Sequence, residues 1–440
     1  MAVDLLVSLS DVHLGAFNTT WAFVTDTDSP ALSRLGGNAP DWKIVDGTPG
    51  HNLCNAVEQS IREEIARLGY DENQIDKRIL ILNGDILDLS LAPTAFACLN
   101  ARCFFHWVER AGFKEVVYIP GNHDHHLWRI AVEEAALHAA VAQGRSRYDR
   151  TVAVAGVSSA LKSLLGVGDA IQFRVAYPHY VHVLSRDATG AAEEWRLVFH
   201  HGHLLEKWWT ALSTLLSSPD GRRHTLEQLE AINEPLTELL WFSVGDAGRL
   251  SDLVSQFYAG ADNSDIMRHL VSNVVSDAFV ALERRWNVKV SGWKRWLIRG
   301  AIVKATTTLA HNGLAGGTGK HKRIEATAGG LRGVALGGEL YKAAVAYRSR
   351  YASVSPSCFI FGHTNKTQVD EPREWLNLAA QGNPTGFEKH IFNTGGWVVE
   401  PTVRSPDASY LIAIGPKVKL VKVPLSDAVI AAALANADLA

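Results

Sequence analysis

Short apolar runs recur along the chain, and several of them end directly in a cluster of polar residues. Their length and their β-branched content are typical of strands that are buried on both faces of a sheet. Helical patterns at 55–68 and 94–111, with apolar residues three and four positions apart, separate the early runs. This alternation of strand and helix predicts an α/β fold. We expect the strands at 5–10, 79–82, 115–119, 180–184, 196–199, 357–361, 390–393, 410–414 and 418–423.

The pattern changes in the middle of the chain. Helical patterns at 226–244, 266–287 and 293–310 follow one another without strands between them, and a glycine-rich stretch at 313–338 comes next. The glycine-rich stretch is either a mobile lid or a surface loop without function. Because 440 residues exceed the usual size of one domain, an insertion is expected. We predict a core formed by 1–203 and 351–440, with a helical cap inserted at 204–350.

Charge and cysteine content narrow the class of protein. Lys+Arg 43 against Asp+Glu 46 gives a formal net charge of −3, which makes no case for a dedicated nucleic-acid binder but does not exclude a local basic patch. The four cysteines form no Cys-X-X-Cys pair, so we expect buried thiols in a reducing compartment. The N-terminus lacks a basic region, and no apolar run reaches the roughly 18–20 residues of a spanning helix, so we expect a cytoplasmic protein.

Five polar clusters follow predicted strands. Because the carboxyl ends of strands in α/β sheets bring distant loops together, we expect these clusters to converge. Their carboxylate, imidazole and amide groups suit divalent cations such as Mn, Zn or Fe, and a shared carboxylate can bridge two ions. Each cluster alone is common in turns and caps, so the prediction rests on all five together. The clusters are Asp11-Val12-His13, Gly84-Asp85-Ile86-Leu87-Asp88, Gly121-Asn122-His123-Asp124, His200-His201-Gly202-His203 and Gly362-His363-Thr364-Asn365.

In this order the clusters resemble the DxH, GDxxD, GNH(D/E), His-Gly and GHxH motifs of the calcineurin-like metallophosphoesterase superfamily. The resemblance covers 5–124, 196–203 and 357–397. It implies a four-layer α/β/β/α sandwich with a centre of two divalent metal ions (Mn, Fe, Zn or Mg) at one edge. The ligands it implies are Asp11 and His13 for the first ion, Asp85 between the two ions, and Asn122, His201 and His363 for the second.

The main departure from the family pattern is Asn365, which stands where the last histidine of GHxH would bind the first ion. An amide oxygen is a harder and weaker donor than imidazole, so the first ion would be held more loosely or would be Mn or Mg rather than Zn. Alternatively, another histidine takes that position. The alternative ligands are His125, His126 and His203.

The fourth cluster contains two neighbouring histidines, either of which could be the metal ligand. His200 precedes His201 on the predicted strand, so its side chain is expected on the opposite face, and we prefer His201 as the ligand.

The implied chemistry is hydrolysis of a phosphate ester. Two cations about 3.5–4 Å apart neutralise phosphate oxygens and lower the pKa of a water between them, so that a metal-bridging hydroxide attacks phosphorus. By the resemblance, His123 is the general acid that protonates the leaving group, and Asp124 holds its tautomer and orientation. Asp88 is expected either to support a ligand or to cap a helix.

The substrate is less constrained. Leu89-Ser90 stands where protein Ser/Thr phosphatases of the superfamily carry Arg-Gly, so the phosphate-clamping arginine is missing there. Residues 393–397 resemble a segment of UDP-2,3-diacylglucosamine hydrolase-like phosphodiesterases, although those enzymes usually have arginine in place of His123. The expected substrate is a phosphate mono- or diester, or a pyrophosphate, of a small molecule or a lipid.

The function has two alternatives from other classes. The basic, Trp-containing segment 292–304 would suit a peripheral membrane protein that contacts an anionic surface and acts on lipid phosphates, or it packs on its own domain. The other alternative is a catalytically inactive scaffold with the same fold, which Asn365 suggests. Nucleic acid is not excluded as a partner.

Overall fold

The computed structural model describes thirteen segments of the chain. The chain divides into two compact units, 1–247 with 343–440, and 248–342. All described residues belong to the first unit, so most of the predicted cap, including the glycine-rich stretch and 292–304, lies outside them, and the predicted domain boundaries stay predictions. The described segments are 3–16, 18–24, 48–90, 92, 94–147, 154–184, 195–203, 226–238, 242, 358–363, 376–377, 391–399 and 408–438.

All nine predicted strands are present, with ends that shift by one or a few residues. Three further strands, β4, β5 and β9, were not predicted. The strands are β1 (Val3–Leu9), β2 (Ile75–Asn83), β3 (Glu115–Ile119), β4 (Val154–Gly156), β5 (Gln172–Tyr177), β6 (His179–Leu184), β7 (Trp195–His200), β8 (Cys358–Phe361), β9 (Leu376–Asn377), β10 (Ile391–Asn393), β11 (Ser409–Ile414) and β12 (Lys417–Lys422).

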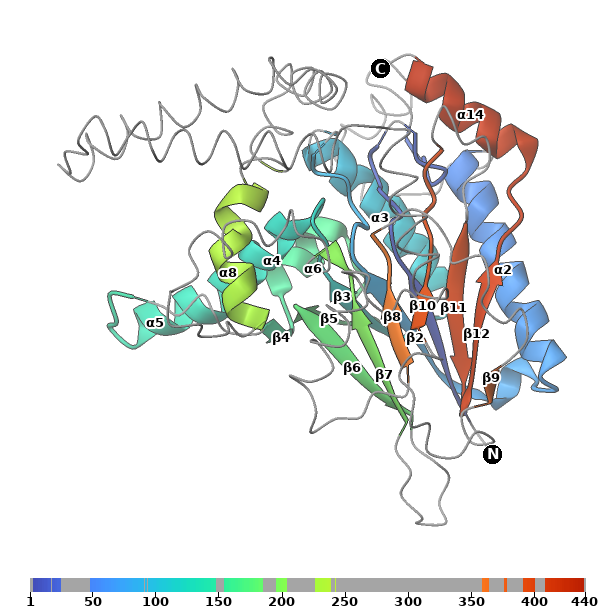
Figure 1. Ribbon diagram of the computed structural model, residues 1–440, viewed down its shortest axis with the longest axis horizontal. Helices are drawn as coiled ribbons and strands as arrows, with labels where there is room; N and C mark the ends of the chain where they lie inside the picture. Colours follow the sequence, from blue (N-terminus) through green and yellow to red (C-terminus); the bar gives the residue numbers. More distant parts are fainter. Residues whose placement is uncertain are drawn as a thin grey trace, which may run out of the picture. The chain divides into compact units, whose positions relative to one another are not determined.

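The helices flank these strands (Figure 1). Helix α2 begins where the Thr48 side chain accepts a hydrogen bond from the His51 backbone and Pro49 occupies the first turn, both common signals of a helix start. The helices are α2 (Pro49–Arg67), α3 (Thr94–Arg110), α4 (His125–Val132), a π-helical turn (Glu133–Leu137), α5 (His138–Ala142), α6 (Ser159–Leu165), α8 (Leu226–Thr237) and α14 (Asp427–Asp438), with a short 3-10 turn at Glu72–Gln74.

The strands form two sheets. The larger has the order β4-β5-β3-β2-β1-β11-β12-β9, and the smaller has the order β10-β8-β7-β6. In the larger sheet β1, β2, β3 and β5 run parallel, and in the smaller sheet β7, β8 and β10 run parallel. Parallel strands place their carboxyl ends at one edge, so the loops after β1, β2 and β3 come together, as do those after β7 and β8.

The alternation along β1 shows why the strand sequences are continuously apolar. Leu5, Val7 and Leu9 belong to the core between the larger sheet and helices such as α2 and α3. Leu6 belongs to a second core that also contains Leu197 of the smaller sheet. The two sheets therefore pack face to face, and each central strand of the larger sheet is buried on both sides. The fold is the predicted α/β sandwich, two sheets flanked by helices.

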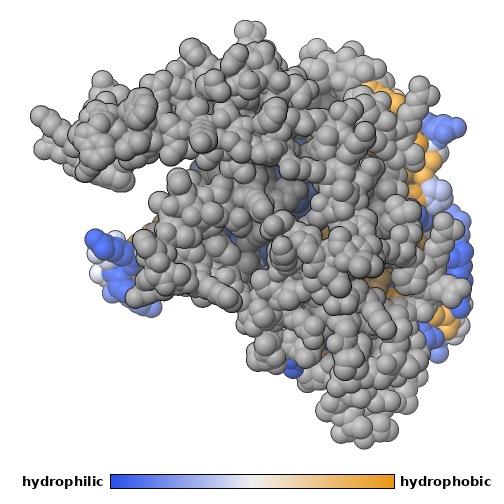
Figure 2. Space-filling model, viewed as in Figure 1, coloured by the Kyte–Doolittle hydropathy of each residue, from blue (hydrophilic) through white to orange (hydrophobic). Residues whose placement is uncertain are grey.

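The cysteines agree with the sequence analysis. All four cysteines are free thiols and all are buried, as predicted. The outer face of α2 is hydrophilic, as the margin of the space-filling view shows (Figure 2), and it carries exposed ion pairs such as Arg62 with Glu58. Among the helices of the described residues, none combines the length and the apolar character needed to span a bilayer.

Candidate metal centre

The loops after β1 and β2 bring three predicted ligands together. Ligand atoms of Asp11, His13 and Asp85 lie within 4.8 Å of one another, and all three residues are buried. Backbone hydrogen bonds join the two loops: the Asp11 N–H donates to Gly84 O (3.0 Å) and the His13 N–H donates to Asp85 O (2.9 Å). The two carboxylates and the imidazole are thus held against one another by the backbone itself.

The loops after β3, β7 and β8 complete a second group around the same carboxylate. Ligand atoms of Asp85, His201 and His363 lie within 4.8 Å of one another. His201 Nε2 lies 3.0 Å from Asp85 Oδ2 and 3.0 Å from Asn122 Oδ1. The His363 N–H donates to both oxygens of Asp11 at 2.9 Å, which ties the two groups together. Asp85 is common to both groups, in the position expected of a bridging ligand.

His200 and His201 face different neighbours at the end of β7. His200 is the last residue of β7, and its Nδ1 accepts a hydrogen bond from the Gly202 N–H at 2.8 Å. The His201 ring instead faces Asp85, and its Nδ1 lies 3.1 Å from the Asn83 carbonyl oxygen. The structure therefore places His201, and not His200, against the other predicted ligands.

Backbone conformation marks the same residues. Asp11 (φ 52°), His13 (φ 51°), Asp85 (φ 52°) and His363 (φ 72°) have left-handed backbone, and they are the non-glycine residues with positive φ in the described part of the chain. Each such residue costs about 1–3 kcal/mol and persists only where the surroundings impose it. All four are predicted metal ligands.

The glycine that opens three of the clusters is required by close packing. A Cβ on Gly84 would overlap the His201 ring, and a Cβ on Gly121 would overlap the Asp85 carboxylate. A Cβ on Gly362 would overlap the Asp11 carboxylate and the Ser10 hydroxyl. The ligands can approach this closely only because these positions lack a side chain.

Neighbouring carboxylates and imidazoles shift one another's pKa values in the centre. Burial would lower the pKa of His13, but the hydrogen bond and charge of Asp88, together with Asp85 and Asp11, outweigh burial and raise it to about 9. Burial likewise opposes a charged His201, and Asp85 above all raises its pKa to about 9. Burial raises the pKa of Asp11. For Asp85, burial acts in the same direction, but His201 and the other histidines hold its pKa well below the usual range.

The donor set fits divalent cations. His13 Nε2 is buried and has no hydrogen-bond partner, whereas its Nδ1 lies 3.0 Å from Asp88 Oδ2. An imidazole with one nitrogen held by a carboxylate and the other bare is the usual arrangement of a metal-ligating histidine. With two carboxylates, further imidazoles and the Asn122 amide oxygen nearby, the residues suit borderline cations such as Mn, Fe or Zn.

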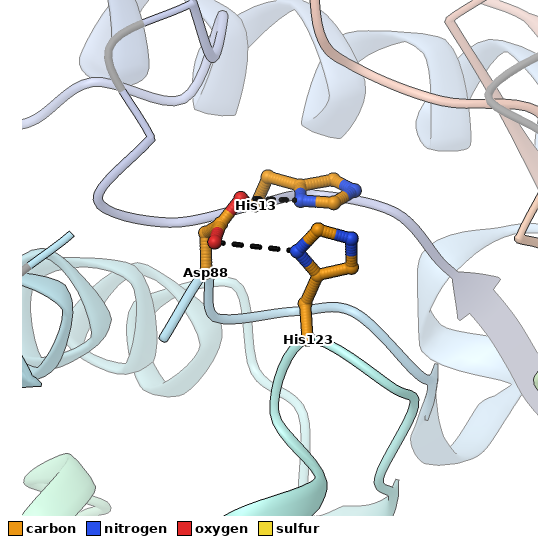
Figure 3. Close-up of side chains that lie close together, drawn as sticks. All are labelled: His13, Asp88 and His123. Atoms are coloured by element: carbon orange, nitrogen blue, oxygen red, sulfur yellow. Dashed lines mark hydrogen bonds and ion pairs between the residues drawn. The ribbon is translucent and has the colours of Figure 1, made fainter. Parts of the chain in front are cut away.

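His123 lies beside this centre and is held by two side chains, of which Figure 3 shows Asp88. Its Nδ1 lies 2.8 Å from Ser90 Oγ and 3.3 Å from Asp88 Oδ1. Ser90 Oγ also donates to Asp88 Oδ1 at 2.6 Å. The single Asp88 carboxylate therefore contacts both His13 and His123, whose rings meet edge to face with centroids 4.7 Å apart. Asp88 supports two imidazoles of the site, which was one of the two roles expected for it.

The predicted role of Asp124 requires correction. Its carboxylate accepts hydrogen bonds from the backbone of Ile86 (2.8 Å) and Gly121 (2.6 Å) and from the Tyr118 hydroxyl, and it is Asp88 with Ser90 that orients His123. Although Asp124 and His123 are adjacent in sequence, the Asp124 carboxylate is directed toward the backbone of the loops at 84–88 and 121–124. Asp124 thus supports the loops that carry the ligands.

Asn365 lies outside the described residues, so its place in the centre stays a prediction. The three histidines considered in its stead contact glutamates of α8 and the residue after it. His203 Nε2 lies 3.2 Å from Glu230 Oε1. His125 and His126 each place Nδ1 close to the Glu238 carboxylate, at 3.1 and 2.8 Å. The four-residue spacing of Glu230, Glu234 and Glu238 was visible in the sequence, but its partners are distant along the chain.

Similarity to known proteins is slight. The sequence matches no protein-family model and no curated protein. Among solved structures, the sulfate thiohydrolase SoxB of Thermus thermophilus, in complex with glycerol, is similar to the chain with 11% sequence identity and a TM-score of 0.26. The match covers 100% of this chain and 61% of SoxB, so the chain spans about three fifths of the length of SoxB. A TM-score this low carries no argument, and the fold and the site rest on the arrangement described above.

Proposed function

We propose that this chain is a metal-dependent phosphoric ester hydrolase of the calcineurin-like metallophosphoesterase type. The observation that carries the proposal is the left-handed backbone at Asp11, His13, Asp85 and His363. Such strain gathers at ligand-binding and catalytic sites, since a structure without a use for it would relax. That it coincides with residues chosen from the sequence for their chemistry supports a metal centre at these loops.

The proposed ligand roles are those implied by the sequence. Two divalent cations (Mn, Fe, Zn or Mg) would neutralise the oxygens of a bound phosphate and lower the pKa of a water molecule so that it can act as nucleophile. Buried carboxylates and imidazole nitrogens would supply the binding, and Asp85, shared by the two groups, is the proposed bridge. The proposed ligands are Asp11, His13, Asp85, Asn122, His201, His363 and Asn365.

His123 is the proposed general acid. Because Ser90 and Asp88 engage its Nδ1, the proton for the leaving oxygen would come from Nε2. The Asp88 carboxylate, 3.3 Å away, would stabilise the charged form of the ring before the proton leaves. The His123 side chain is 19% exposed, so a substrate can reach it beside the buried ligands.

The proposed substrate is a phosphate mono- or diester, or a pyrophosphate, of a small molecule or a lipid. Leu89 and Ser90 leave no arginine at the place where protein phosphatases clamp phosphate. A lipid substrate would bring the chain to an anionic membrane surface. We propose the cytoplasm as its compartment, in keeping with its four free thiols.

The test is turnover of p-nitrophenyl phosphate and bis-p-nitrophenyl phosphate by the full chain with added Mn²⁺. We expect hydrolysis of one or both, its loss after chelation, and its recovery when Mn²⁺ is returned. Asp85→Ala serves as the inactive control. A chain that binds Mn²⁺ but hydrolyses neither ester nor a lipid phosphate would contradict the proposal and favour an inactive scaffold.

A further inference from the structure

Helix α8 presents a row of glutamates to α4 and to the segment after β7. Glu230 and Glu234 lie on α8, and Glu238 follows its last residue, so that the three are spaced four residues apart on one face of the helix. Glu230 and Glu234 are only 3% and 2% exposed. Carboxylates are rarely buried to this degree unless they are paired.

Each glutamate has a basic partner, and Glu230 has a hydroxyl as well. Glu230 contacts His203 and accepts a 2.5 Å hydrogen bond from the Tyr177 hydroxyl. Glu234 forms an ion pair with Arg129. Glu238 joins His125 and His126 through its two oxygens. We call these contacts the α8 seam.

The basic partners in the α8 seam lie on the two segments that leave the candidate centre. Helix α4, which supplies three of the partners, begins two residues after His123. His203 comes two residues after His201, and the centroids of their rings are 5.5 Å apart. The α8 seam thus contacts both the segment that follows the proposed general acid and the segment that follows a proposed ligand.

Buried carboxylates that are paired fix an orientation more than they add adhesion. Removing charges from water costs several kcal/mol per ion, and the attraction between them repays this only in a defined geometry. An apolar helix face could slide or rotate on its neighbour at a small cost, whereas mismatched charges oppose every register but one. Such an interface suits an element whose task is to hold its neighbours in place.

We propose that Glu230, Glu234 and Glu238 are positioning residues that hold the start of α4 and the segment after β7 in the arrangement that His123 and His201 require. The proposal rests on the proposed function for its effect on turnover. The three glutamates touch neither metal group directly and act through Arg129 and the histidines. A loss of the seam should therefore lower kcat and leave the bound metal in place.

The test is a charge exchange between Arg129 and Glu234. We expect Arg129→Glu and Glu234→Arg each to lower kcat on an alkyl phosphate about tenfold, equivalent to about 1.4 kcal/mol of transition-state stabilisation. KM and Mn²⁺ content should stay near those of the unmodified chain. The double variant should recover most of the lost kcat. Glu238→Gln should lower kcat in the same way. Because it keeps the size of the side chain, it tests the proposal even if a charge-reversed variant fails to fold.

A second readout does not depend on turnover. Amide hydrogen exchange of peptides covering 121–132 and 198–203 should speed up in the single variants and return toward the original rate in the double variant. The matched control is Arg62→Glu, which breaks the exposed Arg62–Glu58 pair of α2 and should change neither kcat nor exchange in these peptides.

Three outcomes would overturn the positioning role: unchanged kcat and exchange in the single variants, no recovery in the double variant, or loss of bound Mn²⁺ from Glu238→Gln. If the unmodified chain hydrolyses no ester, the proposed function fails on its own. The exchange measurement then still decides whether the α8 seam orders these segments.

Discussion

Asp88 Oδ2 lies 3.0 Å from His13 Nδ1, although 75 residues separate the two in sequence. The contact leaves His13 Nε2 buried and bare, directed away from Asp88. Burial would raise the pKa of Asp88, but His123 and His13 hold it well below the usual range. The charged Asp88 carboxylate therefore fixes the tautomer of His13. Its negative charge also supports the binding of a cation to His13 Nε2.

Asp88→Asn should weaken the centre without removing a ligand. The amide can still contact His13 but carries no charge, so we expect a 10–100-fold loss of Mn²⁺ affinity, activity, or both, as is usual for such supporting groups. Isothermal titration of the metal-free protein measures the affinity. Ser90→Ala is the matched control, because Ser90 contacts His123 and Asp88 but not His13, and it should change kcat more than affinity. Equal affinity in Asp88→Asn and the unmodified chain would count against the supporting role.

Asp85→Ala should remove both metal ions. Asp85 belongs both to the group with Asp11 and His13 and to the group with His201 and His363, and its Oδ1 also accepts a hydrogen bond from the His123 backbone at 2.8 Å. Asp11 belongs to one group only, so Asp11→Ala should retain about one ion per chain. Elemental analysis of the two variants, purified in the same Mn²⁺ buffer, gives the stoichiometry. A full complement of metal in Asp85→Ala would refute the bridging assignment.

Gly362→Ala tests whether close packing holds the ligands. The added methyl group would overlap the Asp11 carboxylate and the Ser10 hydroxyl, and overpacking of this kind costs about 1–3 kcal/mol. We expect a lower Tm together with weaker Mn²⁺ binding. Gly156→Ala is the control, since a Cβ there meets nothing within 4 Å. Similar melting and metal binding in both variants would show that the centre tolerates displacement of Asp11.

Metal affinity should depend on pH through His13 and His201, whose pKa values are raised to about 9 in the metal-free site. A raised histidine pKa stabilises the metal-free protein fully below the unfolded value near 6.5, and this contribution disappears as pH rises through about 9. A cation must displace these protons, so its affinity should rise over the same interval. Titrations with Mn²⁺ at pH 6.5, 7.5 and 8.5 should show tighter binding at each step, while the Tm of the chelated protein falls. An affinity independent of pH would exclude this competition.

The fold was predictable because its strands are buried on both faces. Leu5 and Val7 pack toward helices while Leu6 packs toward the second sheet, so the whole run is apolar and stands out in the sequence. Strand β5 was missed because Gln172 and Arg174 interrupt its apolar residues. The motif residues that converge were also predictable, since the carboxyl ends of parallel strands share an edge.

Side-chain partners within the site were not predictable in the same way. Asp124 was assigned to His123 by the resemblance, but its carboxylate binds backbone N–H groups of Ile86 and Gly121. Ser90 was noted only for the arginine-glycine pair it replaces, yet its hydroxyl contacts His123. The glutamates of the α8 seam meet residues more than 25 positions away. Such contacts depend on tertiary packing that local pattern does not encode.

His123→Ala should separate proton donation from metal binding. His123 is not among the proposed ligands, so we expect the variant to keep its Mn²⁺ and to lose about 10²–10⁴ in kcat, the usual contribution of a positioned acid. The loss should be large for an alkyl phosphate, whose leaving alkoxide needs a proton, and small for p-nitrophenyl phosphate, whose leaving group is stable as an anion. A steady-state comparison of the two esters measures this difference. An equal loss on both esters, or a loss of Mn²⁺, would mean that His123 acts on the metal ions or on phosphate binding instead of on the leaving group.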